Sequence, residues 1–272
     1  MAPENEDILV SVEAGVGRVT LNRPKAINSL TDAMVATLAK ALDGWEHDDS
    51  VHTVLLTGAG ERGLCAGGDV VAIYHDAQAG GAKTRAFWHD EYVLNAHIAR
   101  YPKPYVAVMD GIVMGGGVGI SAHAGVRVVT DTTKIGMPEV ALGVLPGTGG
   151  TQRFARLVGK ARAIELMATG SLFSFEDAHA MGLVSHVWGD AELSGRTFAQ
   201  AVQDYAKQFT PPNKAAKAVG HIKRAVQSGL ESGFHEGLAL ERELQQRLFE
   251  SDDAKEGLKA NLEKRKANFS GR

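Results

Sequence analysis

Residues 105–150 read YVAVMDGIVMGGGVGISAHAGVRVVTDTTKIGMPEVALGVLPGTGG, and they decide both the fold class and the place of a candidate site. The apolar run Tyr105–Met109 predicts a buried strand, which the turn residues Asp110–Gly111 end. Gly115–Gly117 then open a short helix. Backbone N–H groups at a helix start have no partner within the helix, and the helix dipole favours negative charge there. The stretch therefore predicts a strand, a glycine turn and a helix start suited to an anion.

One carboxylate follows this helix in the same stretch, at Glu139. Pro138 ends regular strand pairing just before it, so the carboxylate can face a pocket. A second glycine pattern, GLCAGGDV at Gly63–Val70, follows an apolar run that ends at Thr57. A tight connection alone also explains such glycines, but two strand–glycine–helix junctions can bring two N–H donors to one oxygen. Two N–H donors and one carboxylate are the fewest groups with which a protein can move a proton next to a carbonyl group.

The composition favours one cytoplasmic domain. The chain has 272 residues, 44% of them hydrophobic, which is enough for one sizeable core. The single cysteine, Cys65, excludes an intramolecular disulfide, and no signal-peptide pattern is seen. We expect no membrane association, because no apolar run approaches ~20 residues, and no nucleic-acid partner, because the net charge is -3. An anionic ligand would need local basic groups, for which Arg23, Lys25 and Arg62 are candidates.

Short β-rich runs alternate with helical patterns along most of the chain, which indicates an α/β architecture. A helix from about Asp32 to His47, capped by Thr31, carries apolar residues at three-to-four spacing. Another helix, from about Thr84 to Arg100, follows a Gly-Gly loop. We expect residues 1–200 to form the core unit and residues 201–272 to form a C-terminal helical region of the same structural unit.

The end of the chain predicts two helices that separate near Ser251, a plausible N-cap. Both helices have an apolar face, which must be buried against the body or against another subunit. We expect oligomerisation to cover part of this surface.

Motifs spread over nearly the whole chain resemble the enoyl-CoA hydratase/isomerase family, the crotonase superfamily. They are NRPKAINSL, CAGGDV, DGIVMGGGVGISAHAGVRVV, GMPEVALGVLPGTGGTQRFARLVGKARAIELMATG and DAHAMGLVSHV. The resemblance implies a crotonase-like spiral of ββα units with a C-terminal helical trimerisation region. It also implies a homotrimer or a dimer of trimers, and an acyl-CoA thioester substrate. No metal or separate cofactor is implied, since coenzyme A is part of the substrate.

The resemblance places the catalytic groups at three positions. The N–H groups of Ala66 and Gly116 would form the oxyanion hole for the thioester oxygen, and Glu139 would act as acid and base. Asp69 is also expected to cap the helix that follows its glycine turn. The expected substrate-binding residues are Lys25, Ala26, Ala66, Gly67, Gly68, Asp69, Gly116, Gly119 and Gly147.

The sequence departs from the family hydratases at one catalytic position. Those hydratases carry a glutamate two residues after the GGG run, where this chain has Gly119. Hydration of a 2-enoyl-CoA is the family default, but it divides water activation and proton delivery between two glutamates. A lone Glu139 would suit a 3-enoyl- to 2-enoyl-CoA isomerase. The 3-hydroxyisobutyryl-CoA hydrolases share Gly119 and local sequence such as FWHDEY, although they have an aspartate at the position of Gly147. A noncatalytic acyl-CoA-binding protein is the alternative from another class.

Other groups near the site have structural explanations. We expect His123 to be a buried histidine with satisfied hydrogen bonds, and Cys65 to be a small buried thiol. Asp90 and Glu91 are expected to form an exposed helical pair. With no second carboxylate nearby, burial is the main effect expected to raise the pKa of Glu139, and we expect this base to be ionised at neutral pH.

Overall fold

The computed structural model describes residues 6–189, 193 and 195–272, so the start of the predicted core unit and a segment near its end lie outside the described residues. A six-stranded sheet forms the centre, with the strand order β1-β2-β3-β4-β6-β9. All neighbouring strands are parallel except β1 and β2. These strands are β1 (Ile8–Glu13), β2 (Val16–Leu21), β3 (Thr53–Gly58), β4 (Tyr105–Met109), β6 (Val126–Thr130) and β9 (His186–Trp188). A smaller sheet joins β5 (Ile112–Met114), β7 (Lys134–Gly136) and β8 (Phe173–Ser174). The predicted α/β class is confirmed.

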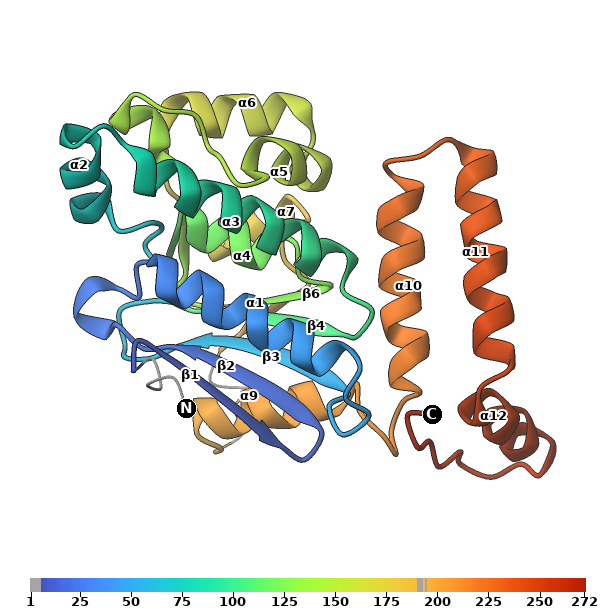
Figure 1. The fold of residues 1–272 in the computed structure, drawn as a ribbon. Coiled ribbons are helices and arrows are strands. Elements are labelled where there is room, and N and C mark those ends of the chain that lie inside the picture. The colour runs from blue at the N-terminus through green and yellow to red at the C-terminus, as the bar shows by residue number, and fades with distance from the viewer. Residues whose placement is uncertain (1–5, 190–192, 194) are drawn as a thin grey trace.

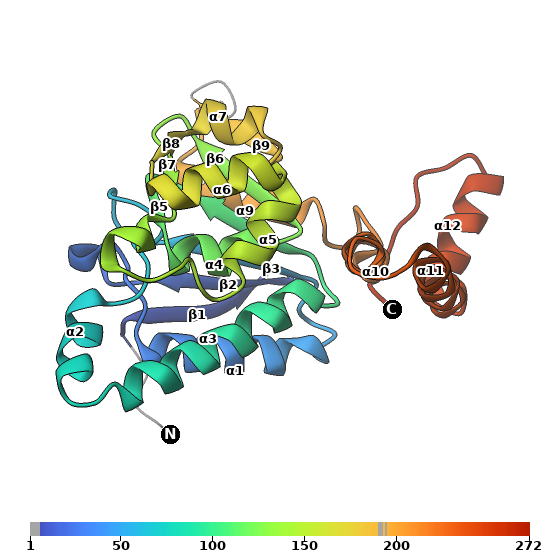
Figure 2. The ribbon, with the colours of Figure 1, turned by 90° about the horizontal axis from the view of Figure 1, so that it is seen from above.

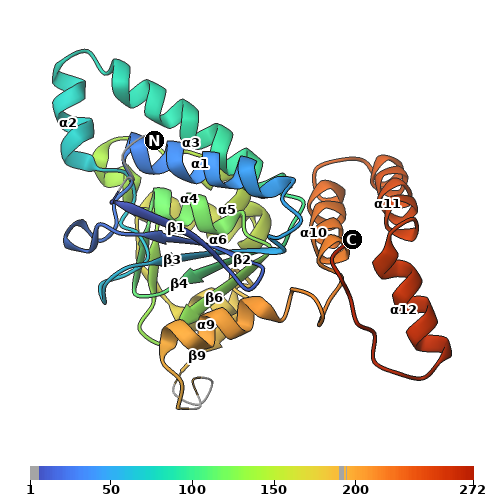
Figure 3. The same ribbon diagram turned by 60° about the horizontal axis from the view of Figure 1, so that its bottom comes forward.

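Helices cover both faces of the large sheet. α1 and α3 lie across one face, and α9 lies across the other (Figures 1 and 3). The helices of the body are α1 (Asp32–Glu46), α2 (Val70–Gln78), α3 (Ala82–Arg100), α4 (Gly116–Ala122), α5 (Gly150–Val158), α6 (Lys160–Thr169), α7 (Phe175–Ala180) and α9 (Phe198–Lys207), with 3-10 segments η1 (Pro24–Ala26) and η2 (Pro138–Leu142). Within the described residues, no helix is both long and apolar enough to cross a bilayer.

Local sequence accounts for where the two long body helices begin. The Thr31 hydroxyl accepts a hydrogen bond from the Met34 N–H at 3.3 Å, which confirms the predicted N-cap of α1. α3 begins at Ala82 rather than at Thr84, because Gly81 takes a left-handed conformation (φ 71°) that only glycine adopts readily and turns the chain directly into the helix.

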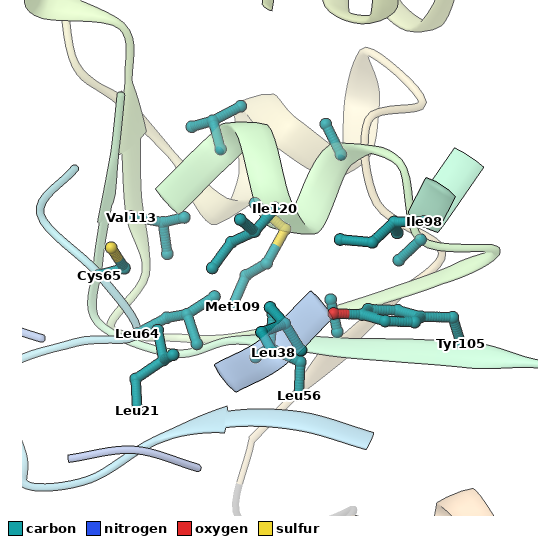
Figure 4. Packing of buried hydrophobic residues seen from close by; sticks show 14 of the residues in the cluster. Leu21, Leu38, Leu56, Leu64, Cys65, Ile98, Tyr105, Met109, Val113 and Ile120 are labelled. Carbon is teal, nitrogen blue, oxygen red and sulfur yellow. The ribbon is translucent and has the colours of Figure 1, made fainter. Parts of the chain in front are cut away.

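The main core lies between the large sheet and the helices on its α1 face, and it anchors both sides of the glycine turn. All five residues of β4 are buried, as predicted for Tyr105–Met109. Tyr105 and Met109 from β4 lie in the same cluster as Ile120 from α4 (Figure 4). Full burial of one such large apolar side chain contributes about 1.5–3 kcal/mol. The strand before the turn and the helix after it are therefore both held in place.

The C-terminal helices α10 (Ala216–Gly229), α11 (Phe234–Phe249) and α12 (Asp252–Leu262) form an arm beside the body (Figures 1, 2 and 3). Ser251 caps α12 by accepting from the Ala254 N–H, which confirms the predicted break between the last two helices. The arm meets the body where buried Lys223 of α10 donates to the Ile98 carbonyl near the end of α3. Large apolar side chains stay exposed along the arm, namely Ile222, Val226, Leu230, Phe234, Leu238, Phe249, Leu258 and Leu262. This confirms the predicted apolar faces.

Candidate active site

The two glycine junctions meet beside the start of α4. The loop before α2 pairs with β5 through a bridge between Cys65 and Val113. Gly67 has a φ of 99°, and a Cβ there would lie 3.4 Å from the Gly116 nitrogen. Glycine at this position therefore allows both an unusual backbone angle and a close approach of the two turns. The meeting of two strand–glycine–helix junctions, expected from the sequence, is observed.

The prediction that the Ala66 N–H is free to bind an oxyanion is wrong. Its N–H donates to the Ile27 carbonyl at 2.9 Å, because Ile27 has a φ of 47° and its carbonyl reaches the loop. The N–H of Gly67 is also engaged, with the Cys65 sulfur at 3.4 Å. Among the described residues, no acceptor for the N–H groups of Gly68 and Gly116 is found. These two free donors are the pair available to an oxyanion: Gly116 is the residue expected, and Gly68 lies two residues further along the first loop than the expected Ala66.

A surface pocket opens beside Gly68. Ala26, Ser29, Ala66 and Asp69 line it, together with the start of α2. Four of the expected substrate-binding residues therefore share one pocket, namely Ala26, Ala66, Gly68 and Asp69. Lys25 lies exposed next to Ala26 in η1.

Asp69 is a structural group at the edge of this pocket. Its carboxylate accepts from the Ala72 N–H and so caps α2 as predicted. Arg23 donates to the same carboxylate at 2.9 Å. Burial raises the pKa of Asp69, but these hydrogen bonds outweigh it and hold that pKa below its usual value. Arg23, one of the three candidate groups for an anionic ligand, is thus already paired with a carboxylate.

Glu139 lies in η2, half-buried and directed at the glycine turn. A Cβ on Gly115 would lie 3.3 Å from Glu139 Oε1. Glu139 Oε2 is buried and has no hydrogen-bond partner among the described residues. Burial raises the pKa of Glu139, as expected.

A second carboxyl group stands beside the turn, at Glu91 of α3. Glu91 is only 2% exposed, so the expected exposed pair Asp90–Glu91 is wrong for its second member. A Cβ on Gly116 would lie 2.8 Å from Glu91 Oε1. Burial raises the pKa of Glu91 to about 7, the nearby Thr148 side chain opposes this, and the charge of Glu139 adds to it. The expectation that no other carboxylate lies near Glu139 is therefore also wrong.

The helical phase of α3 explains why sequence reasoning missed Glu91. Its buried side chains include Phe87, Glu91, Leu94 and Ile98, at spacings of four, three and four residues. This is one continuous helix face, whereas Tyr92 is 49% exposed and points elsewhere. A carboxylate at a position on the apolar face of an amphipathic helix is the sequence feature that could have identified Glu91 as a buried group.

Gly119 of α4 faces the side chains of Thr148, Asn95 and Glu91. A Cβ there would lie 2.9 Å from Thr148 Oγ1, 3.0 Å from Asn95 Nδ2 and 3.5 Å from Glu91 Oε1. α3 thus supplies a carboxyl to the space beside the position where family hydratases carry their glutamate. Gly147, the last expected substrate-binding residue, faces Tyr92, whose hydroxyl would lie 3.4 Å from a Cβ at Gly147.

Two other candidates do not join this group. Cys65 is buried as expected, and burial raises the pKa of its thiol to about 12, so the thiol is neutral. His123 is buried, and burial followed by the nearby charges of Arg153, Lys223 and Arg127 lowers its pKa to about 4. In the described part of the chain neither of its ring nitrogens makes a hydrogen bond of normal geometry, so the expectation of a satisfied histidine is wrong.

The fold and the paired glycine turns define a protein of the crotonase fold. A family model described as enoyl-CoA hydratase/isomerase matches residues 16–219, and the chain belongs to that family. A probable enoyl-CoA hydratase from Rhizobium meliloti is 36% identical over 267 residues, which are 98% of this chain and 99% of that protein. The crystal structure of an enoyl-CoA hydratase from Geobacillus kaustophilus has a TM-score of 0.88 and 35% identity, covering 99% of this chain and 98% of that one.

A second group of relatives matches part of the chain. The mitochondrial 3-hydroxyisobutyryl-CoA hydrolase of Danio rerio is 41% identical over 180 residues, which are 66% of this chain. The matched segment spans 47% of that hydrolase, so the chain corresponds to about half its length.

Proposed function

We propose that this protein catalyses the reversible addition of water to a 2-enoyl-CoA thioester. One observation carries the proposal: two carboxyl groups, those of buried Glu91 and half-buried Glu139, lie against the consecutive residues Gly116 and Gly115 of the turn that offers a free N–H. Hydration needs both an acid and a base at the reacting carbons, and Glu139 alone would supply only one of the two. Full-length similarity to enoyl-CoA hydratases supports the same reaction.

The two N–H groups of Gly68 and Gly116 would bind the thioester oxygen. A water molecule attacks C3 of the enoyl group and gives its proton to a carboxylate, while the electron pair of the C2–C3 double bond moves into an enolate. The enolate oxygen is stabilised by the two donors. C2 then takes a proton from the other carboxyl group, and the hydrated thioester results.

The unequal surroundings of the two carboxyl groups support a division of roles between them. Glu91 is more deeply buried and feels the charge of Glu139, so it keeps its proton up to a pH of about 7. Glu91 is therefore the acid that protonates C2. Glu139 is the base that accepts the proton of water.

The proposal is tested with purified protein and three substrates: crotonyl-CoA, a 3-enoyl-CoA and 3-hydroxyisobutyryl-CoA. Enoyl absorbance and free thiol are followed for the parent protein, Glu91→Gln, Glu139→Gln and the control Asp90→Asn, whose carboxylate is exposed next to Glu91. We expect loss of crotonyl-CoA absorbance, slowed by about 10²-fold or more in each glutamine variant and unchanged in Asp90→Asn.

Other outcomes would contradict hydration. Gain of conjugated-enoyl absorbance from the 3-enoyl substrate alone would identify an isomerase, and thiol release alone a thioester hydrolase. Tight binding of acyl-CoA without any turnover would identify a binding protein. Full activity of Glu91→Gln on crotonyl-CoA would remove Glu91 from the mechanism.

A further inference from the structure

The last helix, α12, has little apolar packing to hold it in place. Of its eleven residues, only Asp253 and Ala260 are buried. A helix of this length is marginally stable on its own in water. The C end of the chain returns from α12 to a place beside α10, between the body and α12 (Figures 1 and 3). The contacts of this returning segment, residues 268–271, therefore bear on how α12 is held.

Asp253 joins the segment to α12. It is only 4% exposed, and its carboxylate accepts from the Ser270 N–H at 2.7 Å, the Ser270 hydroxyl at 3.1 Å and the Gly271 N–H at 2.9 Å. The Asp253 N–H in turn donates to the Arg272 carbonyl at 3.1 Å. Hydrogen bonds to a charged acceptor are roughly twice as strong as neutral ones, and a buried carboxylate without them would be costly. The carboxylate and the segment therefore hold each other.

Gly271 brings the same segment against the body. Its φ is 83°, in the left-handed region that favours glycine. A Cβ there would lie 2.6 Å from Cε1 of His52, in the loop before β3, and 3.2 Å from Cγ of Pro211, in the connection between α9 and α10. The Phe269 N–H donates to the carbonyl of the next proline, Pro212, at 3.4 Å. Glycine at position 271 thus lets the backbone pass directly beside His52.

The Phe269 side chain adds contacts within the arm. A Cβ on Gly257 of α12 would lie 3.5 Å from the Phe269 ring. Phe269 also lines one pocket together with Leu258 of α12 and Ala215, the N-cap of α10. The segment therefore contacts α12, the start of α10 and the body.

We propose that residues 268–271 form a strap that ties α12 to the body, with Asp253 as its anchor on the helix and His52 as its contact on the body. The strap is a second attachment of the arm, apart from the hydrogen bond between Lys223 of α10 and the Ile98 carbonyl. Leu258 and Leu262 of α12 are exposed. By fixing α12, the strap sets the direction in which this apolar face points.

Hydrogen exchange of the full chain tests the anchor on the helix. Asp253→Asn keeps the shape of the side chain but replaces a charged acceptor with a neutral amide, one end of which can only donate. We expect the amides of α12 and of residues 270–271 to exchange about tenfold faster or more, with no change in β4. The matched control is Asp252→Asn, whose carboxylate is exposed, and it should leave the exchange of residues 270–271 unchanged.

Gly271→Ala tests the contact on the body. The added methyl group would press against the His52 ring, and alanine would be strained at this backbone angle. We expect α12 to exchange faster in this variant as well. Gly229→Ala in α10 is its control, because a Cβ there has nothing within 4 Å.

Two outcomes would overturn the proposal. Faster exchange confined to residues 270–271, with α12 unchanged, would show that the segment rests on the arm without holding it. Faster exchange of α12 in Asp253→Asn but not in Gly271→Ala would show that the body takes no part in the attachment. No substrate is used, so the result does not depend on the proposed reaction.

Discussion

Glu91 and Glu139 differ in how strongly their surroundings favour the protonated form, and in the proposed reaction this difference would divide their chemical roles. Glu91 is 2% exposed and faces the charge of Glu139, while Glu139 is half-buried. A base that ionises first and an acid that ionises later give a window of pH in which both are in the required state.

The pH dependence of hydration follows from this order. We expect kcat/KM for crotonyl-CoA to fall as the pH rises through about 7, because Glu91 then loses the proton that C2 requires. Activity should also fall at low pH, where Glu139 becomes protonated. The measurement is initial rate at low substrate from pH 5 to pH 9, and activity that keeps rising above pH 8 would contradict an acid role for Glu91.

The Glu91 carboxyl should also lower the stability of the folded protein at neutral and high pH. Because the folded pKa of Glu91 is raised to about 7 above an ordinary value of 4.5, the folded state binds the proton more tightly than the unfolded state. Stability is therefore lost as the pH rises from about 4.5 to about 7, by up to about 3 kcal/mol. Glu91→Gln should melt at a higher temperature than the parent at pH 8, and the gap should close near pH 4.5. A constant difference at all pH values would contradict this account.

Sequence alone placed Glu139 and Gly116 beside each other but missed two groups at the residue scale. Glu91 was missed because a charged side chain in a helix was expected to be exposed, whereas it lies on the buried face of α3. Gly68 replaced Ala66 as the free donor because Ile27, with its left-handed backbone, reaches the loop from a distant part of the chain. Which N–H stays free in a loop depends on such tertiary partners, and periodicity carries no information about them.

At the scale of elements, the site is a meeting of α3 with the junctions that start α2 and α4. Apolar runs and glycine turns predicted most of these elements from sequence, because burial and backbone freedom are local properties. The contact between α3 and α4 was not predictable, since it depends on how two helices pack over the sheet. Gly119 is the point of α4 that admits the polar side chains of α3 and of Thr148.

Gly119→Ala should disturb that contact. The added Cβ would lie 2.9 Å from Thr148 Oγ1 and 3.0 Å from Asn95 Nδ2, which is closer than atoms normally approach. We expect a loss of about 1–3 kcal/mol of unfolding free energy in urea, together with reduced turnover. The matched control is Gly44→Ala in α1, where a Cβ has nothing within 4 Å, and where alanine should stabilise the helix by about 0.5–1 kcal/mol. Equal behaviour of the two variants would show that the space beside Gly119 is not critical.

At the scale of the whole molecule, the arm of α10–α12 leaves a large apolar surface without a partner in the single chain. Phe234 is 77% exposed and Leu262 is 81% exposed. Apolar surface of this extent is typical of an interface between proteins. We therefore keep the prediction of a homotrimer or a dimer of trimers, with the arm as its contact surface.

Size-exclusion chromatography with light scattering tests that assembly. Leu262→Asp should reduce the measured mass toward that of one chain, because a charge would be buried at the interface, while circular dichroism stays unchanged. Lys40→Gln, on the exposed side of α1, serves as the surface control and should keep the parent mass. A parent protein that is monomeric at micromolar concentration would reject the prediction.

The hydrogen bond from Lys223 to the Ile98 carbonyl affects how firmly α3 is held beside the site. α3 is one uninterrupted helix, with Glu91 and Asn95 in its middle and Ile98 near its end. Any rotation of this helix about its axis would move the Glu91 carboxyl away from the glycine turn, and the hydrogen bond from the arm opposes that rotation. The arm therefore does two things in the single chain: it carries the exposed apolar surface, and it fastens the end of the helix that holds the Glu91 carboxyl beside the glycine turn.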